Sequence, residues 1–188
     1  MNKKNIKKTI DGMFLVYKNA VNLYEEAKIL FNNKRYSRAY VLGVISFEEL
    51  GKLIMVGSEI INIINERPNS QKIFIKKYKS HINKISRSIL ANSKKKVTIN
   101  YITRTFLSRK QKAIIMDVNK QEAFYVNYNK NKFVAPNDKR FKKKAKNILN
   151  ECKNRIEKDK FIIEKSKEEW LKIFLKNAKE INNIQKKY

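Results

Sequence analysis

The chain has 188 residues, of which 42% are hydrophobic and 32% charged, a composition that excludes an intrinsically disordered protein. Its length suits one domain with a core, and only four Gly and two Pro are available for turns, which favours long helices with few connections. The formal net charge of +27 predicts a phosphate-rich partner such as nucleic acid, the ribosome or an anionic membrane surface.

Base composition offers a second explanation for part of this charge. Of the 44 basic residues, 36 are Lys, and Asn and Ile are also abundant. The codons of these three residues are AT-rich, so an AT-rich genome would supply roughly half of the excess over the usual charge of a small domain. The remainder still predicts a strongly basic protein.

Cysteine content and hydropathy bear on the cellular compartment. Cys152 is the only cysteine, so no intrachain disulfide is expected, and no signal peptide is visible, which together predict a reducing cytoplasm. The most apolar stretch runs from Val41 to Ile64. We expect a buried core helix there rather than a membrane span, because charged residues interrupt it: Glu48, Glu49, Lys52 and Glu59.

The first third of the chain predicts two long helices. Apolar residues recur at steps close to 3.6 over residues 3–32, which indicates an amphipathic helix. Residues 35–65 are apolar over much of the helix circumference, so we place this helix at the centre of the fold. A glycine weakens a helix by about 1 kcal/mol relative to Ala, so Gly43, Gly51 and Gly57 predict close approach of another backbone.

A third helix is predicted over residues 70–92, with His81 in its middle and a basic loop at 92–96. The next segment, 97–118, has two readings. Val97, Ile99 and Tyr101 alternate as in a strand, whereas 106–116 has a helical pattern.

Residues 122–136 predict a small hairpin or an extended arm. Its Tyr125, Tyr128 and Phe133, interleaved with lysines, could stack on bases or pin the arm to the helices, and we favour pinning. A helix is then expected from an N-cap at Asn137 to about residue 164. Ser166 and Glu169 match a capping box, which predicts a last helix over 167–185.

Few residues are suited to chemistry. His81 is the only histidine, and it is either a general acid or base or a histidine without a role. A four-helix di-iron site needs Glu-x-x-His pairs, so Glu25-Glu26 and Glu48-Glu49 make a weak metal site and we expect none. We instead expect Glu48 to pair with Lys52, and a buried salt bridge to hold the helices in register.

Several strings resemble the AbiV family of abortive-infection proteins, which is similar to the wider HEPN superfamily. The first group comprises Asn19-Ala20-x-x-Leu23-x-x-Glu26-Ala27, Arg38-Ala39-Tyr40 and Phe47-Glu48-Glu49-Leu50-Gly51-Lys52. The second is Glu122-Ala123-Phe124-Tyr125-Val126-Asn127-Tyr128, followed by Pro136 and a basic helix. The resemblance spans about 19 to 155.

The resemblance implies an all-α, HEPN-like antiparallel bundle in a single helical domain, 1–188. Within it we distinguish a three-helix core (1–93), a basic loop and arm (94–136) and C-terminal helices (137–188). It also implies an antiphage effector that shuts down phage or host translation by acting on RNA or the translation machinery.

Many HEPN proteins are metal-independent ribonucleases that act as dimers, with a motif of Arg, four to six residues, then His. Here Lys76 stands where Arg is expected, with four residues between it and His81, and Lys lacks the bidentate fork of Arg. The candidate catalytic residues are His81, Lys76, Glu48 and Glu49, without a cofactor, and the candidate nucleic-acid contacts are Lys77, Lys79, Lys84 and Arg87.

The expected partners are a second copy of the chain, RNA or the ribosome, and a phage-encoded activator protein, with no membrane. The alternative is a non-catalytic interaction protein that binds ribosome, RNA or a phage protein without cleaving RNA. A helical nucleic-acid-binding module without a defence role is a third hypothesis.

Overall fold

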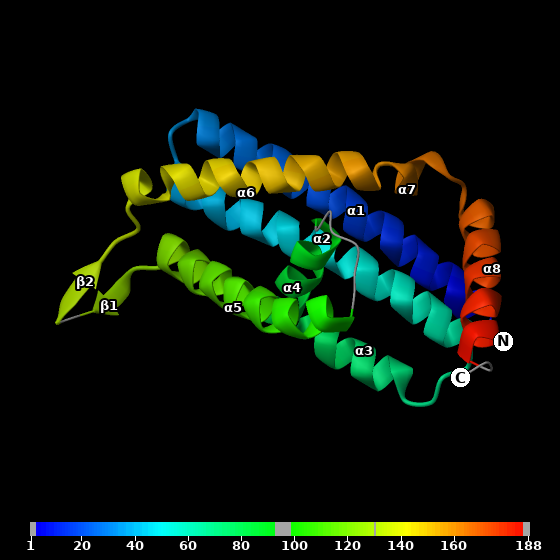
Figure 1. The fold of residues 1–188 in the computed structure, drawn as a ribbon. Helices are drawn as coiled ribbons and strands as arrows, with labels where there is room; N and C mark the ends of the chain where they lie inside the picture. The colour runs from blue at the N-terminus through cyan, green and yellow to red at the C-terminus, as the bar shows by residue number, and fades with distance from the viewer. Residues whose placement is uncertain (1–2, 93–98, 130, 186–188) are drawn as a thin grey trace.

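The computed structural model describes residues 3–92, 99–129 and 131–185 and consists of packed helices with one small hairpin (Figure 1). The helical fold class predicted from the sequence is confirmed. The helices are α1 (Lys3–Asn32), α2 (Tyr36–Ile64), α3 (Ser70–Lys79), α4 (His81–Asn92), α5 (Ile99–Phe124), α6 (Asp138–Asp159), α7 (Phe161–Glu164) and α8 (Lys167–Gln185).

Helix α2 lies at the centre, as its apolar circumference predicts. It packs against α1 along its length, against α6 in its first half, against α4 and α5 on another side, and against α8 near its end (Figure 1). Its buried side chains include Val44, Phe47, Leu50 and Ile60. Because much of its surface is covered by other helices, several polar side chains of α2 are buried, among them Ser46, Glu48 and Glu59.

Glycine allows the closest of these contacts. A Cβ atom built on Gly51 would lie 1.9 Å from the backbone carbonyl oxygen of Lys84 in α4. At Gly43 the corresponding neighbour is a side-chain atom of Ile148 in α6, at 2.8 Å. The predicted backbone approach is therefore found at Gly51, whereas Gly43 faces a side chain and Gly57 has only ordinary contacts with Phe174.

The helix predicted over 70–92 is interrupted, which corrects the placement of His81. Helix α3 ends at Lys79, Ser80 takes an extended conformation, and α4 begins at His81. The hydroxyl of Ser80 accepts a hydrogen bond from the backbone N–H of Asn83 at 3.3 Å, so Ser80 caps the new helix. His81 is therefore the first residue of a helix rather than a residue in the middle of one.

Between α4 and the hairpin, the helical alternative for 97–118 holds wherever the chain is described. Helix α5 runs from Ile99 to Phe124, while Val97 and the basic loop residues 93–96 lie outside the described residues. Strands β1 (Asn127–Asn129) and β2 (Lys132–Val134) then form the predicted hairpin, antiparallel and with Tyr128 opposite Phe133.

The C-terminal helices follow their predicted caps. The side chain of Asn137 accepts a hydrogen bond from the N–H of Arg140, and Ser166 and Glu169 exchange the two bonds of a capping box. The helix predicted to reach 164 ends earlier, at Asp159, and α7 follows as a separate short helix. No helix in the described ranges is long and apolar enough to cross a membrane.

We predict opposite effects for two glycine-to-alanine substitutions. Gly51→Ala places a methyl group against the α4 backbone, so the helices must separate, and we expect a loss of about 2 kcal/mol in unfolding free energy. Gly12→Ala meets nothing within 4 Å and should stabilise α1 by up to about 1 kcal/mol. Urea denaturation of both variants checks this, and equal effects would contradict the close α2–α4 contact.

Candidate functional site

The candidate site is built around the carboxylate of Glu48, which is buried in the middle of α2. Glu48 is only 2% exposed, and its chain neighbours Phe47 and Glu49 are also buried. A carboxylate removed from water costs several kcal/mol unless charged or hydrogen-bonding groups compensate for it. The residues around Glu48 therefore show how this cost is met.

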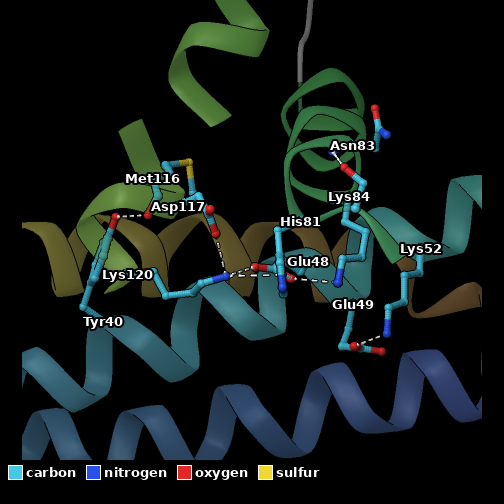
Figure 2. Close-up of polar contacts among 11 residues, drawn as sticks. Tyr40, Glu48, Glu49, Lys52, His81, Asn83, Lys84, Met116, Asp117 and Lys120 are labelled. Atoms are coloured by element: carbon cyan, nitrogen blue, oxygen red, sulfur yellow. Dashed lines mark hydrogen bonds and ion pairs between the residues drawn. The ribbon is translucent and has the colours of Figure 1, made fainter. Parts of the chain in front are cut away.

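Three basic side chains surround this carboxylate (Figure 2). The Nζ of Lys120 lies 2.6 Å from Oε1, the Nζ of Lys84 lies 3.0 Å from Oε2, and the Nδ1 of His81 lies 2.7 Å from Oε2. Lys120 also contacts Asp117, one turn earlier in α5, at 2.8 Å. We call Glu48, His81, Lys84, Asp117 and Lys120 the glutamate cluster.

Ion pairing decides the charge state of the cluster. Burial would raise the pKa of the Glu48 carboxyl, but hydrogen bonds from Lys120, His81 and Lys84 outweigh burial and lower this pKa below its usual value. For Lys120, burial acts to lower the ammonium pKa, yet Asp117 and Glu48 raise it overall. Glu48 is therefore ionised and Lys120 protonated at neutral pH.

The His81 side chain is 54% exposed, although one of its ring nitrogens contacts a buried group. Nδ1 contacts the Glu48 carboxylate, while about half of the side-chain surface stays open to solvent. A carboxylate acceptor favours the tautomer that carries its proton on Nδ1, which leaves Nε2 with a free lone pair. The site thus holds a half-exposed imidazole against a buried carboxylate, at the first turn of α4.

The same cluster can be tested as a metal site. Glu48, His81 and Asp117 each offer one ligand atom, and these atoms lie within 4.8 Å of one another. However, the ammonium of Lys120 contacts both carboxylates and lies 3.3 Å from Nδ1 of His81. A divalent cation would have to displace this protonated lysine, so the cluster is better suited to a salt-bridge network than to a metal.

Glu49 belongs to a separate contact. It pairs with Lys52, whose Nζ lies 4.9 Å from the ring centre of Tyr78 in α3. The predicted pair between Glu48 and Lys52 is therefore wrong, because Glu48 points toward α4 and α5 while Lys52 contacts Glu49. A buried salt bridge between helices is nevertheless found, because Glu48 pairs with Lys84 of α4 and Lys120 of α5.

The predicted basic residues separate into two groups. Lys84 is buried against Glu48, whereas Lys76, Lys77, Lys79 and Arg87 are exposed. A cleft of about 430 Å³ lies between α3, α4 and α5. Among the residues that the structure describes, four cationic side chains and no carboxylate line this cleft: Lys77, Arg87, Arg109 and Lys110. The cleft is therefore suited to an anion such as phosphate.

Sequence reasoning missed Lys120, Asp117, Arg109 and Lys110. All four lie on α5, whose first part had two readings, so their position relative to Glu48 and Arg87 could not be inferred. The available signal was the buried Glu48 itself, which requires cationic partners from other helices. Many lysines of the chain could have paired with Glu48. Lys84 and Lys120 do so because α4 and α5 pack on α2 at this point.

The chain is an all-α bundle with an HEPN-like fold, in which the Glu-Glu-Leu-Gly-Lys segment of α2 contacts the histidine that begins α4. The family model described as AbiV (HEPN_AbiV) matches residues 8–157, so the chain belongs to the AbiV family of HEPN proteins. This membership suggests an abortive-infection function. No curated protein and no solved structure matches the chain significantly.

Replacing Glu48 by Gln should destabilise the protein strongly. The variant keeps the shape of the side chain but leaves Lys84 and Lys120 with less negative charge, so we expect a loss of about 3 kcal/mol. Urea denaturation at neutral pH measures it. Glu25→Gln is the matched control, since Glu25 forms an exposed pair with Lys28 and its loss should change little.

The pH dependence of the unfolding free energy tests whether Glu48 stabilises the fold as an ionised carboxylate. Because the folded-state pKa of Glu48 is lowered, its contribution is present above the ordinary carboxyl pKa of 4.5 and is lost as pH falls through the lower folded-state pKa. The difference between wild type and Glu48→Gln should shrink when both are measured at about pH 3. A difference that stays constant with pH would show that the charge of Glu48 is not what stabilises the fold.

Proposed function

We propose that this protein is an abortive-infection effector that shuts down phage or host translation by cleaving RNA, with His81 as the proton-transfer residue. The observation that carries the proposal is the contact of 2.7 Å between Nδ1 of a half-exposed imidazole and the buried carboxylate of Glu48. Carboxylate–histidine pairs of this kind fix the ring and its tautomer for general acid–base catalysis.

The proposed reaction needs no metal. Nε2 of His81 takes the proton of a ribose 2′-hydroxyl, and the oxygen attacks the adjacent phosphorus. The bond from phosphorus to the 5′ oxygen breaks, and this leaving oxygen takes a proton from a second acid. The products are a 2′,3′-cyclic phosphate and a 5′-hydroxyl end.

A homodimer would supply that second acid. In this proposal a two-fold axis brings two copies of α4 together, and His81 of the partner subunit protonates the leaving oxygen. Lys76, exposed on α3 near the start of α4, supplies positive charge for the transition-state phosphate. Glu48 orients the imidazole, while Glu49 acts only through its contact with Lys52.

The second candidate is a non-catalytic effector that binds RNA, the ribosome or a phage protein. It is favoured by the way the two lysines compensate Glu48: Lys84 and Lys120 each pair with this carboxylate without help from His81. The cluster would then act as a structural lock between α2, α4 and α5. A phage-encoded activator protein is compatible with either candidate.

Removal of the imidazole separates the two candidates. His81→Ala should reduce cleavage of labelled RNA at least about 100-fold in buffer with EDTA, because it removes the proton acceptor. The fold should persist, since the side chain is half-exposed and both lysines still compensate Glu48. Wild-type products should carry 2′,3′-cyclic phosphate ends, detectable by resistance to phosphatase.

The matched control is Leu15→Ala, which truncates an exposed side chain on α1, outside the glutamate cluster. It should cleave RNA and restrict phage like wild type. If purified wild type cleaves no RNA, and cells carrying His81→Ala still resist phage, the catalytic proposal fails and the binding candidate stands.

A further inference from the structure

The aromatic hairpin, defined as β1 and β2 with Tyr128 and Phe133, projects from the end of the bundle opposite α8 (Figure 1). Phe133 is 80% exposed and Tyr128 is 65% exposed. Tyr125 and Val126, which precede β1, are also exposed. The interpretation that Tyr125, Tyr128 and Phe133 pin this segment to the helices is therefore wrong.

Other groups hold the hairpin at its root. Arg38 of α2 donates a hydrogen bond to the backbone oxygen of Phe124 at 2.9 Å and lies over the Phe124 ring. At the other end, the backbone N–H of Ser37 donates to Asp138 at 2.7 Å. The two ends of the segment are thus fixed to α2, and the aromatic rings beyond them are not needed for attachment.

The pairing of the strands sorts their side chains onto two faces. Tyr128 and Phe133 are directly opposite each other, so both rings lie on one face, with centroids 5.0 Å apart. The other face carries the pairs Asn127 with Val134 and Asn129 with Lys132. One face therefore offers two adjacent π surfaces, and the other mainly amide and ammonium groups.

The helix that follows the hairpin adds positive charge. Lys139, Lys142, Lys143 and Lys146 occupy positions separated by three or four residues on α6 and are all exposed. We call these four residues the lysine stripe. From residue 122 to 151 the sequence holds eight Lys or Arg and three acidic residues, and one of these, Glu122, pairs with Arg140. The segment keeps a net positive charge, so this end of the molecule complements a polyanion.

We propose that the aromatic hairpin and the lysine stripe form a docking platform for single-stranded RNA, an inference that rests on the proposed action on RNA. Bases stack on Tyr128 and Phe133, and the lysine stripe contacts the backbone phosphates. The hairpin is separated from α6 by only three residues, 135–137, and exposed aromatic rings combined with a run of lysines are typical of single-strand platforms. The cores of protein–protein interfaces, in contrast, are depleted of Lys.

Binding to a labelled oligouridylate with 2′-O-methyl riboses tests the platform, because the methyl groups block cleavage and leave binding intact. The full chain should bind, and Phe133→Ala should weaken binding roughly 10-fold through loss of one stacking surface. Phe133→Trp should bind like wild type or better. Phe133→Leu, which keeps apolar area without a π face, should bind as weakly as Phe133→Ala.

The contribution of the lysine stripe is measured by the salt dependence of RNA binding. Changing Lys142 and Lys143 together to Gln should reduce the slope of log Kd against log salt by up to about 1.4, the value for two lost phosphate contacts. Lys153→Gln is the matched control, since Lys153 is exposed on α6 outside the stripe and lies 3.8 Å from Glu157. Leu15→Ala, at an exposed apolar position on α1, is the control for the hairpin.

The outcomes separate this inference from the proposed function. If wild type binds the oligouridylate and the hairpin and stripe variants bind equally well, the platform is refuted while action on RNA stands. If Phe133→Leu binds like wild type, stacking is refuted. If wild type binds no RNA but binds anionic vesicles through Phe133, a membrane is the partner and both proposals fail.

Discussion

The fold depends on the burial of one negative charge, that of Glu48, in a helix that other helices cover on most sides. Its carboxylate is compensated by Lys84 from α4 and Lys120 from α5, so the charge fixes where both helices lie on α2. Gly51, three residues along α2, removes the steric obstacle to that approach, because α4 passes where a Cβ atom would be. Charge and steric fit thus select the same packing.

The pairing of Glu48 with the two lysines also positions His81, and no second carboxylate has to be buried for this purpose. The two lysines compensate the buried carboxylate, and the imidazole uses an oxygen that is already ionised and held in place. Ser80 ends α3 and caps α4, which puts His81 on the first turn of a helix where its outer edge stays exposed. The salt-bridge network and the imidazole therefore share one carboxylate.

Local signals allowed much of the fold to be predicted. The amphipathic period of α1, the apolar circumference of α2 and the caps at Asn137 and Ser166 are encoded within a few residues each. The break at Ser80 was missed because apolar spacing continues across it. The partners of Glu48 could not be predicted, since any of the 36 lysines satisfies the same charge requirement and only long-range packing chooses Lys84 and Lys120. The exposure of Phe133 likewise depends on how the hairpin leaves the bundle.

Nitrogen-15 NMR measures directly whether Glu48 fixes the tautomer of His81, because the chain contains a single histidine. In wild-type protein with a neutral imidazole, we expect the proton on Nδ1 and the lone pair on Nε2. Glu48→Gln should shift the ring toward the mixture seen for free imidazole, and Glu25→Gln should leave it unchanged. A wild-type ring that carries its proton on Nε2, or that averages both tautomers, would contradict the account.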